Sequence, residues 1–369
     1  MKIQPESATK TANIIIDFFS NIDRIDDYFR LRKIERVKNL PAPIPGFGLE
    51  DDMFQNYDMH PEDMDIEVAQ IDNQTFNAML EKVASFSPDQ APGKELKLVV
   101  KEKNTNTLLG FIKLGSPIIN SKPRNNYLGD VPELTIFNQR AIMGFVIVPV
   151  QPFGYNYLGG KLMALICTSH KVREMLNDKY ETEFCLFETT SLYGNIKGMS
   201  MYDGLKPFLR FKGDTESKFV PTLGEEAYAS CKKIIEDDVQ GEIIHKDASS
   251  RKLKITTKMI SLIKSSLKET DMELHDKFVS AIKKAESVTT QKRFYMSDYG
   301  YENTRDVLLG KTETLIKGPN YHKHDLENII SWWKRKASSR YNKLKSEDRI
   351  RKELEVWNAD TMNKIDIIR

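Results

Sequence analysis

The segment AIMGFVIVPVQPFGYNYLGGKL, residues 141–162, carries the clearest structural signal in the sequence. Residues 141–150 are an almost unbroken apolar run, which is typical of a strand buried on both faces. A glycine-containing loop, residues 151–160, follows the strand. An amphipathic helix is predicted over residues 161–179, because its apolar residues recur at helical spacing. The segment therefore predicts a buried strand, a glycine loop and a helix N-terminus in direct succession.

Glycines in such a loop allow backbone N–H groups to approach a phosphate closely, because no Cβ holds the ligand away. The helix N-terminus behind the loop adds the positive end of the helix dipole. We therefore interpret the loop as a candidate binding site for a phosphate-bearing cofactor. A plain connection between strand and helix is the alternative. The residues predicted to line the site are Val148, Val150, Gly154, Gly159, Gly160 and Lys161.

Further strands are predicted on both sides of this segment. Residues 96–100 and 108–114 are apolar runs separated by an asparagine-rich turn, which predicts a hairpin. Residues 184–188 predict a short buried strand, and residues 202–212 predict a glycine turn followed by one more strand. Helical spacing is present over residues 11–39, 223–237, 256–268, 271–286 and 325–356. The predicted fold class is α+β, with a central mixed sheet and flanking helices.

This succession of elements resembles the acyl-CoA N-acyltransferase fold, called GNAT. The resemblance implies that the glycine loop holds the pyrophosphate of acyl-CoA. It also implies that Tyr202, which precedes a glycine turn, lies near the departing thiolate and acts as a general acid. The glycine spacing departs from the usual Arg/Gln-x-x-Gly-x-Gly/Ala form of that fold. A tyrosine that only packs in the core is the alternative for Tyr202.

Glu188 ends a predicted buried strand, in the segment FCLFETTSLYG. A buried carboxylate is costly unless it is paired or has a chemical role. We expect Glu188 to act as the base that deprotonates an attacking amine, or to position the substrate. A structural hydrogen bond to the neighbouring threonines is the alternative.

Residues 115–130, GSPIINSKPRNNYLGD, form a polar segment between two strands. Loops of this kind often bind substrate. Arg124 is the candidate for a phosphate or carboxylate contact, because its guanidinium matches such groups bidentately. Ser116 and Tyr127 complete the predicted substrate-binding set. A surface excursion without function is the alternative.

Residues 95–215 resemble the DUF4338 family, which includes the DruA-like components of Druantia anti-phage systems. The residues that carry the resemblance are Gly115, Ser116, Arg124, Tyr127, Gly129, Glu188, Thr189, Gly198 and Tyr202. The chain departs from the family pattern at two places where tryptophan is common, which read Pro149-Val150 and Phe208. The C-terminal blocks YMSDYGYEN and WWKRKASSRYNKLK resemble proteins of large tailed phages, some of them similar to Mom-like DNA-modifying transferases. The resemblance therefore implies a phage or defence setting.

Residues 331–345, SWWKRKASSRYNKLK, contain six Lys or Arg and no acid. An apolar stripe at helical spacing should pack on the protein, and the basic side chains should form a separate face. Such a face predicts nucleic-acid contact, with one tryptophan ring available to stack on a base. A solvated helix face is one alternative, and contact with a membrane surface is another, although the apolar stripe is better used for packing. The candidate nucleic-acid-binding residues are Trp332, Lys334, Arg335, Lys336, Arg340 and Lys343.

The composition excludes several protein classes. The net charge is only +2, so no partner can be inferred from the total charge. Three cysteines without C-x-x-C spacing argue against a disulfide framework and favour a reducing compartment, so a cytoplasmic location is expected, in the bacterial host if the chain is of phage origin. The sequence contains no run of 18 apolar residues, so no membrane-spanning helix is predicted. The histidines predict no metal site.

The sequence therefore predicts three consecutive regions. Residues 1–94 form an N-terminal helical and acidic-loop region, residues 95–220 a GNAT-like core, and residues 221–369 a helical region that packs on the core. The predicted function is transfer of an acyl or related group to an amine, with acyl-CoA as cofactor and a nucleobase in DNA as one candidate acceptor. The alternatives are a nucleic-acid-binding protein without catalysis and a phage or defence assembly protein with a protein partner.

Overall fold

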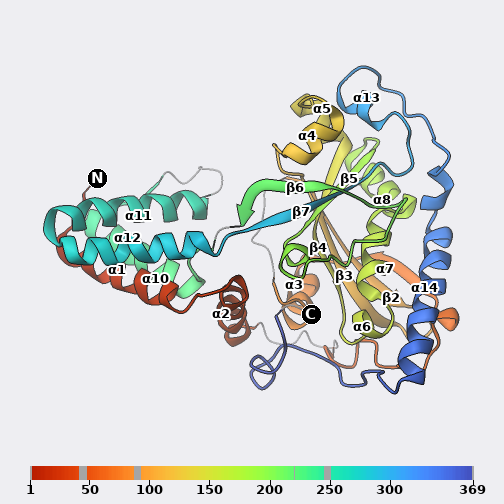
Figure 1. Ribbon diagram of the computed structural model, residues 1–369, viewed down its shortest axis with the longest axis horizontal. Helices are drawn as coiled ribbons and strands as arrows, with labels where there is room; N and C mark the ends of the chain where they lie inside the picture. Colours follow the sequence, from red (N-terminus) through yellow and green to blue (C-terminus); the bar gives the residue numbers. More distant parts are fainter. Residues whose placement is uncertain (1, 41–47, 87–92, 220, 245–250, 368–369) are drawn as a thin grey trace. The chain divides into compact units, whose positions relative to one another are not determined.

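The computed structural model describes residues 2–40, 48–86, 93–219, 221–244 and 251–367. The chain divides into two compact units (Figure 1). Unit 1 comprises Met1–Asn39, Lys218–Thr290 and Asp366–Arg369. Unit 2 comprises Leu40–Ser217 and Gln291–Ile365.

This division differs from the three consecutive regions predicted from the sequence. In the sequence, residues 218–290 lie between two strands of the sheet in unit 2, yet they pack with the N-terminal helices. Apolar helix faces bury against each other wherever they lie in the chain, so sequence order does not set the boundary. Residues 40–94 and 291–365 correspondingly belong to the unit that contains the sheet.

The sheet in unit 2 has seven strands in the order β1-β2-β3-β4-β5-β7-β6. β4 and β5 are parallel, and the pairs β1/β2, β2/β3, β3/β4 and β5/β7 are antiparallel. The strands are β1 (Ile66–Gln70), β2 (Glu95–Glu102), β3 (Thr107–Gly115), β4 (Ala141–Pro149), β5 (Leu186–Ser191), β6 (Arg210–Phe219) and β7 (Thr290–Ser297). The predicted α+β class with a mixed sheet and flanking helices is confirmed.

Helices cover both faces of the sheet in unit 2. On one face, α3 (Asn73–Val83) packs with Val99, Phe111 and Val146 in one apolar cluster. On the other face, a larger cluster joins Ile112 and Ile147 to three helices. These helices are α7 (Gly159–Cys167), α8 (His170–Tyr180) and α14 (Leu326–Ser346). Neighbouring side chains of a strand point to opposite faces, which is why Val146 and Ile147 belong to different clusters.

The buried strand predicted at residues 141–150 is confirmed as β4, Ala141–Pro149. The helix predicted over 161–179 is two helices, α7 and α8, because Ser169 caps the second. Its Oγ accepts a hydrogen bond from the Val172 N–H at 3.2 Å. The remaining helices of unit 2 are α4 (Lys122–Leu128), α5 (Leu134–Arg140), α6 (Phe153–Asn156), α9 (Tyr193–Ile196) and α13 (Thr304–Leu308), with 3₁₀ turns at Pro61–Asp63 and Tyr321–His324.

Unit 1 is helical. Its helices are α1 (Pro5–Ser20), α2 (Ile25–Lys38), α10 (Glu225–Val239), α11 (Arg251–Thr270) and α12 (Met272–Ser287). α1 packs against α10, α11 and α12, burying Ala12, Ile15 and Phe19. Buried residues such as Cys231 in α10 and Phe278 in α12 contribute to the core of this unit. Among the described residues of the chain, no helix is both long and apolar enough to cross a membrane.

A buried histidine at the start of α8 leads to a testable prediction about stability. The Nε2 of His170 lies 2.9 Å from the Tyr321 carbonyl, and Arg173 Nε donates to its Nδ1 at 3.2 Å, which requires a neutral ring. Burial, followed by the charge of Arg173, lowers the pKa of His170 to about 4. In the unfolded chain, His170 binds a proton near its ordinary pKa of about 6.5. The stability that the neutral ring contributes above this pH is therefore lost as the pH falls toward 4.

Urea unfolding between pH 7 and pH 5 checks this prediction. The His170 contribution should decrease at a rate approaching about 1.4 kcal/mol per pH unit. His170→Gln retains one donor and one acceptor but cannot be protonated, so its stability should depend less on pH over this range. An identical pH dependence in the variant and the wild type would contradict the assignment.

Candidate functional site

The parallel strands β4 and β5 separate part of the way along the sheet. They pair from Ala141 with Leu186 to Gly144 with Thr189. Beyond this point β4 continues to Pro149 beside β3, and β5 continues beside β7. Ligands of sheets with parallel strands commonly bind at the carboxyl ends of the strands. We call the place where β4 and β5 separate the fork.

Polar side chains lie at the fork. Thr189 Oγ1 donates a hydrogen bond to the Gly144 carbonyl at 3.0 Å, on the last residue pair before the strands separate. The hydroxyl of Tyr202 interacts with Thr189, and the Tyr202 ring packs edge-on against Tyr295 at 5.3 Å. Burial raises the pKa of Tyr202, so its hydroxyl stays protonated at physiological pH.

The N-terminus of α7 follows β4 by way of the short helix α6. Tyr157 has a right-handed backbone conformation (φ −115°, ψ 11°) and Leu158 a left-handed one (φ 54°, ψ 39°). Successive residues of this kind turn their N–H groups toward a common point and form an anion-binding nest. In the part of the chain that the structure describes, the N–H groups of Leu158, Gly159 and Gly160 donate to no protein acceptor.

The glycines of the loop make room for side chains of the protein itself. A Cβ on Gly159 would lie 2.6 Å from the Phe153 ring, and one on Gly154 would lie 2.5 Å from the Gln151 side chain. A Cβ on Gly160 would meet only the flexible Met201 side chain, at 2.8 Å from its sulfur. Gly160 is therefore the position where a ligand could approach α7 after a small side-chain movement. Of the other predicted cofactor residues, Val148 in β4 is half-buried, and Val150, which follows the strand, is fully buried.

Lys161, in the first turn of α7, belongs to a charged cluster. Its ammonium donates to the Asp203 carbonyl at 2.6 Å, and burial lowers the pKa of Lys161. The Asp203 carboxylate accepts from Arg293 at 3.1 Å and from Tyr295 Oη at 2.8 Å. Burial acts to raise the pKa of Asp203, but the hydrogen bonds from Ser200 and Tyr295 and the charges of Arg293 and Lys161 lower it. Asp203 is therefore an ionised anchor for the segment that carries Tyr202.

Arg124 and Glu188 form a fully buried ion pair. Arg124 Nη1 lies 3.2 Å from both carboxylate oxygens, and the two side chains have no exposed surface. Arg124 also donates to the carbonyls of Ile118 and Ile119 at 2.9 and 2.7 Å. Its guanidinium carbon lies 4.0 Å from the centre of the Phe137 ring. Burial raises the pKa of Glu188 to about 7, and Arg124 opposes the rise.

The predicted catalytic pair, Glu188 and Tyr202, is not brought together on one face. Tyr202 contacts Thr189, and consecutive residues of a strand point to opposite faces of the sheet. The structure instead brings Glu188 to Arg124, which the sequence placed in the substrate-binding set. This pairing fixes α4 against β5.

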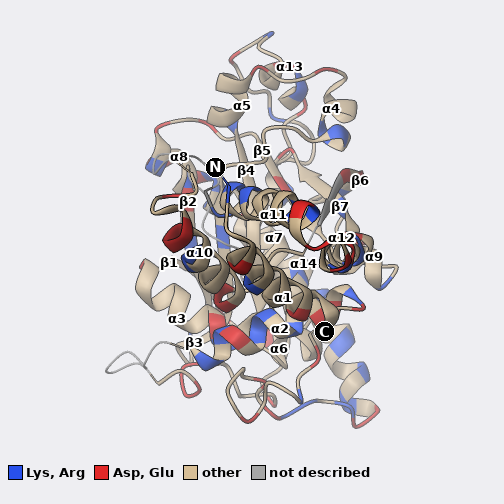
Figure 2. Ribbon diagram, turned by 90° about the vertical axis from the view of Figure 1, so that its left-hand side faces the viewer, with Lys and Arg blue, Asp and Glu red and all other residues tan. Residues whose placement is uncertain are grey.

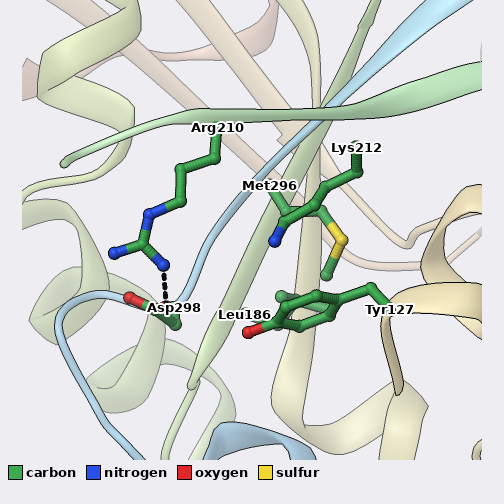
Figure 3. A pocket seen from close by; sticks show the side chains of 6 residues that line it. All are labelled: Tyr127, Leu186, Arg210, Lys212, Met296 and Asp298. Carbon is green, nitrogen blue, oxygen red and sulfur yellow. Dashed lines mark hydrogen bonds and ion pairs between the residues drawn. The ribbon is translucent and has the colours of Figure 1, made fainter. Parts of the chain in front are cut away.

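The other two predicted substrate-binding residues lie apart from each other. Ser116 Oγ accepts from the Lys94 N–H at 2.9 Å, at the end of the β2–β3 hairpin. Tyr127, near the end of α4, lines a small pocket with residues of β5, β6 and β7 (Figure 3). The residues that line the pocket are Tyr127, Leu186, Arg210, Lys212, Met296 and Asp298.

The pocket around Tyr127 is small and basic. It offers about 10 Å³ of space for the centre of a water-sized molecule, which is enough for about one water. Figure 3 shows Lys212 and Tyr127 pointing toward each other, and the Lys212 ammonium lies 3.7 Å from the ring centroid. Arg210 pairs with Asp298 at 3.0 Å. Burial, followed by the charge of Arg210, lowers the pKa of Lys212.

The Lys and Arg positions of α14 are blue in Figure 2. Their side chains have different environments. Trp332 packs edge-on against Phe208 at 5.8 Å, and Lys334 donates to the Glu62 carbonyl at 2.8 Å. Arg340 contacts Tyr155. Arg335, Lys336 and Lys343 are exposed. The opposite stripe is buried, as the helical spacing predicts, and consists of Ile329, Trp333, Ala337, Tyr341 and Leu344.

The sequence interpretation missed three residues of the charged cluster, namely Asp203, Arg293 and Tyr295. Arg293 and Tyr295 are two residues apart in β7, so they lie on the same face of the strand. That alternation was a usable signal, but the segment lacks the aliphatic residues that usually mark a strand. Among the described residues, no three His, Cys, Asp or Glu side chains gather where they could bind a metal ion.

Comparison with known families gives a match that includes this region. Residues 47–200 match the family model of the Druantia protein DruA. The match confirms the DruA-like resemblance predicted from the sequence. It covers the fork, the α7 loop and the Arg124–Glu188 pair, and it ends before Tyr202. No curated protein and no solved structure matches the chain.

Proposed function

We propose that this DruA-like chain is a group transferase that binds the pyrophosphate of an acyl-coenzyme A at the N-terminus of α7. The observation that carries the proposal is the set of N–H groups of Leu158, Gly159 and Gly160, which lack protein acceptors beside the fork. Gly159 and Gly160 are buried, and buried N–H groups are nearly always hydrogen-bonded. A nest at a helix N-terminus suits phosphate oxygens.

Two further features fit this ligand. Lys161 places a positive charge at the start of the same helix, 2.6 Å from the Asp203 carbonyl. The loop before Asp203 exposes apolar side chains, with Met199 71% and Met201 39% exposed. The apolar arm of such a cofactor needs an apolar surface next to the phosphate site. Met201 lies directly over Gly160, so its movement would open the helix N-terminus.

In this proposal, Tyr202 is the proton donor. An acyl-coenzyme A would supply an activated thioester at the fork. The Tyr202 hydroxyl is held there by its contact with Thr189, and it stays protonated because burial raises its pKa. As the amine nitrogen bonds to the acyl carbon and the C–S bond breaks, the Tyr202 Oη donates a proton to the departing sulfur, and the proton lost by the amine restores the Tyr202 hydroxyl. Arg124 and Glu188 act as positioning residues, since both are enclosed by the protein.

The acceptor in this proposal is an amine, with a nucleobase in phage or host DNA as one candidate. A base inside a duplex would have to leave the stack to reach the fork. The alternative function is recognition of nucleic acid or of a defence partner without catalysis. Cofactor binding separates the two, because only a transferase requires it.

The test is calorimetric titration of the full chain with acetyl-coenzyme A and, separately, with S-acetylpantetheine, which has the thioester but no phosphate. Acetyl-coenzyme A should bind, and S-acetylpantetheine should bind much more weakly, because the phosphates provide the contacts with α7. Absence of acetyl-coenzyme A binding, or equal affinity for both compounds, would overturn the proposal.

A further inference from the structure

Three arginines converge on Tyr155, which lies in α6 between β4 and α7. The guanidinium carbons of Arg340 and Arg351 lie 4.6 and 3.9 Å from the ring centroid. Arg349 donates to the Tyr155 hydroxyl at 3.2 Å. Arg340 Nε also donates to the Tyr155 carbonyl at 3.3 Å. Cation–π contacts of this kind hold the guanidinium groups of Arg340 and Arg351 against the Tyr155 ring.

The backbone fixes this arrangement. Asn156 is fully buried, and its side-chain amide donates to the Arg351 carbonyl at 2.7 Å. Its Oδ1 accepts from the Arg351 N–H at 3.1 Å. The chain reverses after α14 at Asp348, whose φ is +52°, and then pairs with Gln151 through Glu355. This reversal brings Arg349 and Arg351 back to the Tyr155 side chain, which Arg340 also contacts.

The acids near the cluster do not balance its charge. Arg349 pairs with Glu347 at 2.7 Å, and Arg351 pairs with Glu355 at 3.4 Å. Arg340 has no carboxylate partner among the residues that the structure describes. Residues 331–355 contain nine Lys or Arg and four Asp or Glu. Cations held close together repel one another, so an added anion would stabilise the arrangement. The side chains of Arg349 and Arg351 remain 54% and 53% exposed.

We propose that this cluster, with the exposed Lys336 and Lys343, binds the phosphate backbone of nucleic acid. Lys336, Arg340 and Lys343 are spaced four and three residues apart and lie on one side of α14. They span about 10 Å at 1.5 Å per residue, which matches about three phosphates of one strand. Ser339 and Asn342 are exposed between them and can donate neutral hydrogen bonds to phosphate oxygens.

This pattern favours nucleic acid over an acidic protein. Arginine and lysine side chains arranged along a helix, with serine and asparagine between them, suit an evenly spaced line of phosphates. The guanidinium groups also match the two oxygens of a phosphate. The inference does not depend on transfer chemistry, since the surface would bind nucleic acid whether or not α7 binds a cofactor.

Fluorescence anisotropy with labelled duplex and single-stranded DNA tests the inference. The full chain should bind, and the logarithm of its affinity should fall linearly with the logarithm of the salt concentration. The variant Lys336→Gln/Arg340→Gln/Lys343→Gln should weaken binding on the order of 100-fold near 100 mM salt. It should also reduce the salt slope by about 2 to 3, since each phosphate contact contributes about 0.9.

The control is Lys103→Gln/Lys277→Gln/Lys311→Gln, which changes the net charge equally. These lysines are 65%, 64% and 60% exposed, and each forms a surface ion pair. The control should bind DNA nearly as the wild type does, and both variants should unfold at the wild-type temperature. Equal losses in both variants, or no DNA binding, would overturn the inference. Binding of poly-glutamate with the same loss on mutation would also overturn it and indicate an acidic protein partner.

Discussion

Replacement of Arg124 by methionine is expected to lower the free energy of unfolding by about 3–5 kcal/mol, because removing one member of a buried ion pair leaves the other charge without a partner. Methionine also leaves the carbonyls of Ile118 and Ile119 without the donors that Arg124 provides. The same substitution at Arg140, which pairs with the exposed Glu183 at 3.5 Å, should cost less than about 1 kcal/mol.

The loss in the Arg124 variant should depend on pH. Burial already raises the pKa of Glu188 to about 7 in the wild type, and loss of Arg124 raises it further. In the unfolded chain, Glu188 loses its proton near its ordinary pKa of 4.5. The folded protein holds this proton to a higher pH, so its free energy of unfolding decreases as the pH rises from 4.5 through the raised pKa. Arg124→Met should therefore be more strongly destabilised at pH 8 than at pH 5.

Urea unfolding of both single variants at the two pH values measures these effects. The double variant Arg124→Met/Glu188→Gln removes both charges, so it should recover part of the lost stability at pH 8. If Arg124→Met lost no more free energy of unfolding than Arg140→Met, the buried ion pair would not be important for stability. A double variant that is no more stable than Arg124→Met at pH 8 would contradict the assigned interaction between the two side chains.

Substitution of Gly160 by aspartate is expected to abolish most acetyl-coenzyme A binding without unfolding the protein. Gly160 lies in the first turn of α7, where a carboxylate is favourable to the helix dipole. A Cβ there meets only the flexible end of Met201, which can move. Two unit charges about 4 Å apart repel by about 4 kcal/mol at an effective dielectric constant of about 20. The dissociation constant should therefore rise on the order of 100-fold or more.

Gly160→Asn is the matched control, because asparagine has the size of aspartate without its charge. It should weaken binding far less, while thermal unfolding of both variants stays near that of the wild type. Gly159 is unsuitable for this test, since a Cβ there would lie 2.6 Å from the Phe153 ring. Equal binding losses in the aspartate and asparagine variants would attribute the effect to bulk and would contradict a phosphate at α7.

The elements with uniform patterns could be predicted from the sequence. β4 is apolar along almost its whole length because both faces of the sheet are covered there. Its position inside the sheet could therefore be predicted. β1 could not be recognised, because IEVAQ follows an acidic stretch and is stabilised by pairing with β2, which is distant in sequence. β7 was missed because it lacks the aliphatic residues that usually mark a strand, and because its partner β5 lies about 100 residues earlier in the chain.

The candidate site was predictable in its parts but not in its pairings. Arg124, Glu188, Tyr202 and Gly160 were all identified from residue type and context. That Arg124 pairs with Glu188 depends on α4 packing over β5, which no local pattern encodes. The cluster of three arginines around Tyr155 could not be predicted either, because a buried asparagine and a chain reversal bring these residues together.

The most direct test of the central claim is the amide signal of Gly160 in protein labelled with ¹⁵N-glycine. The Gly160→Asn variant, which lacks that signal, assigns it. Titration with acetyl-coenzyme A should move the signals of Gly159 and Gly160 more than those of glycines outside the α7 loop, such as Gly241, because the N–H groups of Gly159 and Gly160 would donate to the phosphate. Binding detected by calorimetry with both signals unmoved would contradict a phosphate site at the N-terminus of α7.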